Sequence, residues 1–179
     1  MINKKQTKID REDTVAQKET KHLIMVKVDN RPGVLSRITG LFTRRGYNIE
    51  SLVTGMTQDP SVYHITVSVI GTDDDVELLA RQLERCMEVI DVKCDGGEDW
   101  EFVSREMLLI RVPCSSPEKR VEILNVCSLI GCRSAGVGKD SVIVEVAGDS
   151  STVSAALRAF ELFGDIDVIH SGTVGIDMY

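Results

Sequence analysis

The turn that contains Asn30, Pro32 and Gly33 is the part of the sequence best suited to bind a small ligand. An apolar run precedes it and an amphipathic pattern follows it, so the sequence predicts a strand, a tight turn and a helix. Pro and Gly let a ligand approach the backbone closely. The unpaired N–H groups of a first helical turn, helped by the helix dipole, attract a carboxylate. Because Asn30 can accept a hydrogen bond from an ammonium group, the turn can hold a free amino acid.

The other reactive side chains are too scattered to predict catalysis or metal binding. His22, His64 and His170 fall in three separate predicted strand regions, with no second His or Cys at metal-ligand spacing. Three consecutive aspartates at 73–75 are typical of a helix start rather than of a cation loop. The five cysteines contain no C-x-x-C pair and lie mostly in apolar runs, which favours reduced, buried thiols.

Composition bounds the class of protein. A chain of 179 residues with 42% hydrophobic content can form one medium domain or two small ones. A net charge of −7 argues against general nucleic-acid binding, which requires a concentrated basic surface. No stretch approaches the roughly 18 apolar residues of a membrane span, and charges occupy the N-terminus where a signal peptide requires an apolar block. We therefore expect a cytoplasmic protein without a membrane or nucleic-acid partner.

The first half of the chain is predicted to be one α+β domain over residues 21–95. Residues 1–20 are polar and are predicted to be a mobile tail. Strands are expected over 23–28, 48–56, 62–70 and 89–94, and helices over 33–45 and from 73 onward. In the third strand, His64, Thr66 and Ser68 alternate with apolar residues. One sheet face is therefore expected to be apolar and the other mixed, and the mixed face can simply be solvated.

The second half repeats this order after a glycine-bearing polar linker over residues 96–103. Strands are expected over 105–112, 132–138, 141–147 and 165–169, with helices over 117–130 and after Asp149. The second domain is thus placed at 104–179. The fold class is α+β, with two ferredoxin-like βαββαβ domains in tandem. Exposed sheet edges in such domains favour a homodimer or a higher homo-oligomer.

Three segments carry a resemblance to a known family. Residues 30–52, NRPGVLSRITGLFTRRGYNIESL, resemble the ACT domain of the regulatory small subunit of acetolactate synthase, also called acetohydroxyacid synthase. Residues 104–112, SREMLLIRV, are similar to the strand that begins the second domain of that family. Residues 171–176, SGTVGI, are similar to its closing motif. The first motif is long and contiguous, so the first domain is identified as an ACT domain of this family.

The resemblance implies a regulatory role. Small subunits of this family bind the thiamine-diphosphate-dependent catalytic large subunit, raise its activity and transmit feedback inhibition by valine, sometimes by leucine or isoleucine. Thiamine diphosphate, magnesium and FAD belong to that large subunit, so we expect no cofactor in this chain. Asn48 resembles a residue that reaches the effector from the neighbouring subunit of a dimer. The effector-binding residues expected from the turn and from the resemblance are Asn30, Gly33, Val34, Leu35, Asn48 and Ile49.

Other interpretations of the same residues remain open from the sequence alone. Asn30 can cap a turn, Gly33 can serve only the backbone, and Asn48 can pair within its own strand. Arg31 and Pro32 stand where several family members carry acidic and Ser residues, so this loop is stiffer and more basic. A free-standing amino-acid sensor or transcriptional regulator is the alternative function, although no helix-turn-helix or basic ribbon is evident. Fold class alone does not exclude a small enzyme.

Overall fold

The computed structural model describes residues 19–95 and 101–178. Residues 1–18 of the predicted tail and residues 96–100 of the predicted linker therefore lie outside the described residues. The elements of the first half are β1 (Thr20–Asp29), α1 (Val34–Arg45), β2 (Ile49–Met56), β3 (Val62–Gly71), α2 (Asp73–Leu83) and β4 (Val89–Cys94). Those of the second half are β5 (Phe102–Pro113), α3 (Pro117–Leu129), β6 (Arg133–Val137), β7 (Ser141–Gly148), α4 (Ser150–Glu161) and β8 (Asp167–Asp177).

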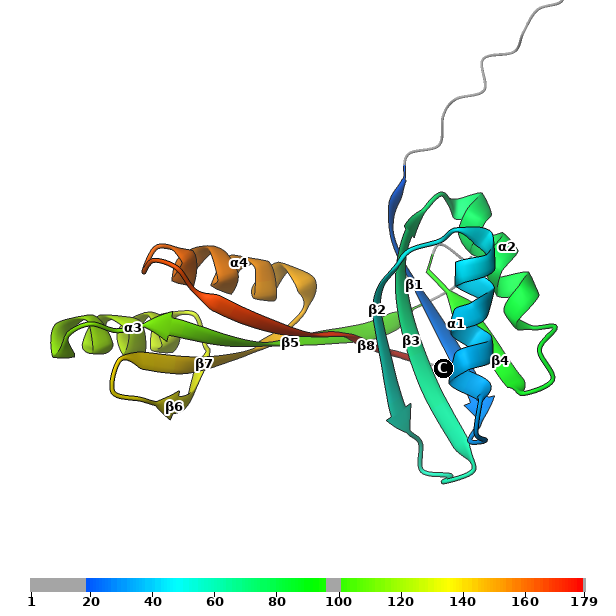
Figure 1. The fold of residues 1–179 in the computed structure, drawn as a ribbon, viewed down its shortest axis with the longest axis horizontal. Helices are drawn as coiled ribbons and strands as arrows, with labels where there is room; N and C mark the ends of the chain where they lie inside the picture. The colour runs from blue at the N-terminus through cyan, green and yellow to red at the C-terminus, as the bar shows by residue number, and fades with distance from the viewer. Residues whose placement is uncertain (1–18, 96–100, 179) are drawn as a thin grey trace, which may run out of the picture.

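Two four-stranded antiparallel sheets confirm the predicted fold class (Figure 1). The strand order is β2-β3-β1-β4 in the first sheet and β6-β7-β5-β8 in the second. Both are the order expected of a βαββαβ unit, in which the first and third strands lie in the centre. In the first sheet β2 and β4 are therefore the edge strands.

Each half has its own apolar core between its helices and one face of its sheet. The spacing of Val34, Ile38 and Phe42 places all three on the buried side of α1. The fully buried core of the first half also includes Ile24, Val26, Val28, Ile65, Val67, Val69, Val76, Leu79 and Leu83. A second cluster around Leu108, Ile110, Ile123, Val144 and Phe160 forms the core of the second half. The alternation predicted for β3 is confirmed, because its apolar residues face the helices.

Two glycines delimit α1 and fix the turn that precedes it. Gly33, at the N-cap, has φ of 86°, and Gly46, at the C-cap, has φ of 76°. Both values lie in the left-handed region, which residues with a Cβ atom rarely occupy. The backbone N–H of Gly46 donates to the carbonyls of Phe42 and Thr43 and closes the last helical turn. Gly33 reverses the chain after β1, so the first helical turn begins beside the end of that strand.

The last strand is longer than its predicted range of 165–169. In the structure β8 continues to Asp177, and its second part pairs with the beginning of β5, where Phe102 lies opposite Asp177 and Glu106 opposite Thr173. The strand β5 begins at Phe102, inside the range predicted as linker. Pairing between β5 and β7 starts only at Glu106, so residues before it on β5 form a two-stranded extension with the end of β8. Local polarity and two glycines concealed this extension in the sequence.

The two-stranded extension reaches the face of the first sheet that α1 and α2 do not cover (Figure 1). There the backbone N–H of Gly175 donates to the Thr66 hydroxyl, with 3.2 Å between the nitrogen and the oxygen. Met25, Thr66 and Ser68 are almost fully buried, although they point away from the apolar core. Simple solvation, one of the alternatives left open for this mixed face, therefore does not apply at Thr66 and Ser68.

Candidate ligand-binding sites

A small pocket of about 130 Å³ lies beside the turn between β1 and α1. Four of the six residues expected to bind an effector line it together, namely Asn30, Gly33, Val34 and Leu35. Its remaining lining residues are Val28, Asp29, Arg31, Thr54, Tyr63 and Ile65. Sequence reasoning missed the contributions of β2 and β3, which come from strand register. Val28 lies opposite Tyr63, so the end of β1 brings Tyr63 to the pocket.

Two of the three expected backbone donors are free in this turn. The N–H of Val34 donates to the Arg31 carbonyl at 3.3 Å, a long hydrogen bond. In the described parts of the chain, the N–H groups of Gly33 and Leu35 have no acceptor. Both belong to the start of α1, where the helix dipole favours negative charge. The turn can therefore offer two N–H groups to a carboxylate without breaking a hydrogen bond.

Asn30 is held in place by the loop between β2 and β3. Its side-chain Nδ2 donates to the Pro60 carbonyl at 2.9 Å, and its backbone N–H donates to the Ser61 carbonyl at 2.7 Å. The side-chain oxygen receives no hydrogen bond from any residue that the structure describes. This arrangement leaves one amide oxygen as a fixed acceptor at the pocket, which suits an ammonium group.

Asn48 and Ile49 do not line this pocket within one chain. The Asn48 side chain donates to the Glu50 carboxylate at 3.4 Å, and Ile49 packs against the first core. The strand β2 meets the pocket only at Thr54, six residues beyond Asn48, which is about 20 Å along a strand. The role expected for Asn48 thus requires a second copy of the chain. It stays a prediction.

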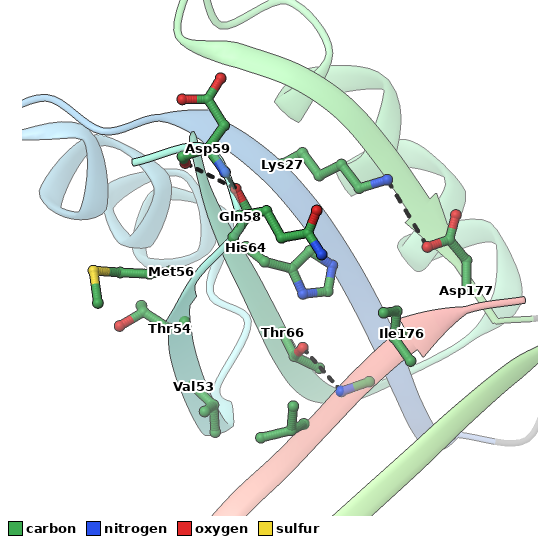
Figure 2. Close-up of a pocket in the computed structure, with 14 residues that line it drawn as sticks. Lys27, Val53, Thr54, Met56, Gln58, Asp59, His64, Thr66, Ile176 and Asp177 are labelled. Atoms are coloured by element: carbon green, nitrogen blue, oxygen red, sulfur yellow. Dashed lines mark hydrogen bonds and ion pairs between the residues drawn. The ribbon is translucent and has the colours of Figure 1, made fainter. Parts of the chain in front are cut away.

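A larger cleft of about 710 Å³ lies between the β2–β3 hairpin and the end of β8 (Figure 2). Sequence reasoning did not find it, because its two walls come from different halves of the chain. The wall from the first half includes Lys27, Val53, Thr54, Gly55, Met56, Thr57, Gln58, Asp59, His64 and Thr66. The wall from β8 is formed by Val174, Gly175, Ile176 and Asp177.

Charged side chains at one end of this cleft neutralise one another. Lys27 Nζ lies 3.8 Å from a carboxylate oxygen of Asp177 and 3.8 Å from one of Asp91. Lys93 also donates to the Asp177 carboxylate. The Lys93 hydrogen bond, followed by the charge of Lys27, lowers the pKa of Asp177 despite partial burial. Asp177 therefore ties the end of β8 to β1 and β4 in its ionised form.

Comparison with known proteins assigns both halves of the chain to one family. Residues 24–91 match the family described as AHAS small subunit-like ACT domain. Residues 105–178 match the family described as small subunit of acetolactate synthase. The chain is also 41% identical over 157 residues to a probable acetolactate synthase small subunit of Archaeoglobus fulgidus, covering 87% of this chain and 96% of that one. The chain belongs to the acetolactate synthase small-subunit family.

Further relatives agree with this assignment in sequence and in fold. The acetolactate synthase small subunit of Bacillus subtilis is 37% identical, with 86% of this chain and 88% of that one covered. The crystal structure of the acetolactate synthase small subunit from Thermotoga maritima superposes with a TM-score of 0.76 at 28% identity. That match covers 89% of this chain and 98% of the other. The resemblance seen in the motifs is thereby confirmed, and the chain is a regulatory rather than a catalytic subunit.

Residues 19–95 and 101–178, which the structure describes, contain neither a metal-ligand cluster nor a membrane-spanning helix. No group of three or more His, Cys, Asp or Glu side chains there is placed to hold a metal ion. The helices in the same ranges are all too short or too polar to cross a membrane.

Proposed function

We propose that this chain activates the thiamine-diphosphate-dependent catalytic subunit of acetolactate synthase and makes it sensitive to feedback inhibition. The effector is valine, with leucine or isoleucine as the related possibilities. The observation that carries the proposal is the match of both halves of the chain to the small-subunit family. The same match favours a subunit of a complex over a free-standing amino-acid sensor.

The chemistry of the small pocket supports a branched-chain amino acid as effector. The free N–H groups of Gly33 and Leu35 suit its carboxylate, and the Asn30 oxygen suits its ammonium group. Val34, Leu35 and Ile65 supply apolar surface beside these polar groups. A pocket of about 130 Å³ is small enough to favour a short aliphatic side chain over an aromatic one.

A dimer through the edge strand β2 would complete this site. An edge strand presents unpaired backbone groups that a second copy can satisfy. Antiparallel pairing of two β2 strands about a two-fold axis near Ser51 would place Asn48 of one copy opposite Thr54 of the other. Because Thr54 lines the pocket, Asn48 would then reach the effector from the neighbouring subunit. Effector binding at such an interface can change the quaternary arrangement.

Catalysis is assigned to the partner. We expect thiamine diphosphate, magnesium and FAD in the large catalytic subunit and none of them in this chain. We also expect the complex to work in the cytoplasm, without nucleic acid or a membrane as partner, in keeping with the net charge of −7.

Reconstitution with the cognate catalytic subunit tests the proposal. Acetolactate formation from pyruvate is measured for the catalytic subunit alone, for this chain alone and for the mixture, with and without each of valine, leucine and isoleucine. We expect no activity from this chain alone, higher activity from the mixture, and inhibition of the mixture by at least one of the three amino acids. Activity that scales with this chain alone, or a mixture no faster than the catalytic subunit, would contradict the proposal.

A further inference from the structure

Two polar side chains in the cleft beside β8 have no hydrogen-bond partner among the residues that the structure describes. They are the His64 ring and the Gln58 amide, and both point into the cleft (Figure 2). His64 is half-buried on β3, where Thr66 accepts a hydrogen bond from Gly175 and Ser68 pairs with Ser51, whereas Gln58 is exposed. An imidazole and an amide that meet at one place offer both donors and acceptors to a ligand.

The charges beside His64 balance, which argues for an uncharged ligand. The Asp59 carboxylate, on another residue of the cleft wall, points away from His64 and accepts hydrogen bonds from Ser61. Lys27 is matched by Asp91 and Asp177, and Asp177 also accepts a hydrogen bond from Lys93. A ligand anion would face these carboxylates, and a ligand cation would face the two ammonium groups. Burial, followed by the charge of Lys27, lowers the pKa of His64, so its ring is neutral at pH 7.

Apolar side chains from both halves of the molecule form the rest of the cleft. Met56 is 76% exposed on one wall, and Val174 and Ile176 are 50% and 62% exposed on the other. Such exposed apolar surface around a few convergent polar groups is typical of small-molecule sites, and about 710 Å³ lies in their usual size range.

We propose that this cleft binds an uncharged, largely apolar small molecule whose carbonyl or hydroxyl group forms hydrogen bonds with His64 and Gln58. The site adjoins the effector pocket, which opens beside the β1–α1 turn, and the two have Thr54 in common. Its ligand touches the first sheet and β8 together. Binding therefore stabilises the contact between the two halves of the chain, because a ligand stabilises the conformation that it binds.

The experiment uses the full chain and an uncharged naphthyl ketone, 6-propionyl-2-(dimethylamino)naphthalene. This probe is apolar, carries one carbonyl acceptor and shifts its fluorescence to shorter wavelength in an apolar site. We expect saturable binding with blue-shifted emission. Replacing Val174 with Asp introduces a charge into the wall and should weaken binding at least about tenfold. His64→Ala removes a hydrogen-bond partner and should weaken it about fivefold.

Val137→Asp is the matched control. Val137 is 55% exposed, slightly more than Val174, but it lies on β6 and does not line the cleft. The Val137→Asp variant should bind the probe with the same affinity as the unmodified chain. Met56→Asp, on the opposite wall, repeats the test if circular dichroism shows that Val174→Asp does not fold. Unchanged probe affinity in His64→Ala and in a folded wall variant would overturn the proposal, as would equal weakening in Val137→Asp.

Discussion

Gly33 has a backbone conformation that favours glycine, although there is open space where a side chain would lie. Its φ of 86° disfavours any residue with a side chain, whereas a Cβ atom built at this position meets no atom within 4 Å. A substitution therefore strains the backbone but does not create a clash. Any side chain at this position would project beside the free N–H groups that are expected to bind the effector carboxylate.

Gly33→Asp should abolish inhibition by valine or shift it to much higher concentration. The new carboxylate would compete for the same N–H groups and repel the effector carboxylate. The measurement is the valine concentration for half-inhibition of the reconstituted enzyme. Activation of the catalytic subunit should persist, because Gly33 takes no part in the core.

Gly131→Asp is the control for Gly33→Asp. Gly131 also has a left-handed φ, 71°, and open space around its Cβ position, so the substitution adds the same strain and the same charge far from the pocket. Its half-inhibition concentration should stay at the wild-type value. Wild-type inhibition of Gly33→Asp would show that the turn is structural only.

At the scale of elements, the end of β8 lies on the first sheet because it carries glycines where the two surfaces meet. A Cβ atom at Gly172 would lie 2.8 Å from Val53 and 3.0 Å from Ser51. At Gly175 it would lie 2.9 Å from the Met25 sulfur. Cβ contacts shorter than 3.0 Å essentially never occur, so a side chain at Gly172 or Gly175 would require Val53 or Met25 to move. Polar contacts then fix the direction of the strand, among them the bond from Gly175 to Thr66.

Gly172→Val should separate the two halves without unfolding either of them. Its φ of 83° adds strain to the clash, and overpacking of this kind costs about 1–3 kcal/mol. Because each half has its own core, we expect native helix and sheet content, a larger radius of gyration in small-angle X-ray scattering, and faster hydrogen exchange at the Gly175 amide.

Gly136→Val on β6 is the control for the added side-chain volume, because Gly136 does not have a positive φ. A Cβ atom at Gly136 would meet Ile143 at 3.7 Å, which is ordinary van der Waals contact. It should leave the radius of gyration and the exchange at Gly175 unchanged. An unaltered radius in Gly172→Val would mean that this contact does not hold the halves together.

The same elements show what local pattern predicts and what it does not. Alternation in β3 and the stripe of Val34, Ile38 and Phe42 are local signals, so the order of elements and both cores follow from sequence. The length of β8 does not follow from the sequence, because Gly172 and Gly175 weaken the strand signal. Both glycines are required by close contacts with residues more than a hundred positions away. Residues 171–176 are recognisable in the sequence as a motif of the family, but their contact with the first sheet is not.

The candidate sites divide in the same way. Asn30 and Gly33 belong to a turn whose chemistry can be recognised locally, and the structure brings them together with Val34 and Leu35. Thr54 and Tyr63 join the pocket through strand register, which local pattern does not specify. The cleft beside β8 depends on the contact between two domains and was therefore beyond reach of the sequence.

In the whole molecule, the edge strand β2 connects these features. Thr54 lines both the effector pocket and the cleft beside β8, which places the two sites at one edge of the first sheet. The same edge is the surface expected to pair with a second copy. A change of subunit pairing at β2 would therefore alter the geometry of both sites and the contact with the end of β8.

Mixing two defective variants tests whether the effector site is shared between two copies. Asn48→Ala removes a polar partner and should weaken valine binding by about 1–3 kcal/mol, or roughly five- to a hundredfold. In a heterodimer with Gly33→Asp, one site contains both defects and the other contains neither. About a quarter of all sites in a random mixture should then bind valine with wild-type affinity, since half of the dimers are heterodimers.

Co-expression with two different affinity tags and equilibrium dialysis against labelled valine provide the measurement. Each variant alone should have no site of wild-type affinity, and the purified heterodimer should have one site per dimer. Regained binding on mixing cannot come from a site built within one chain, because every chain in the mixture carries a defect. Wild-type affinity in Asn48→Ala alone would remove Asn48 from the effector site. A purified heterodimer without a wild-type site would show that Asn48 acts within its own chain, and a chain that stays monomeric at micromolar concentration with valine present would remove the shared site altogether.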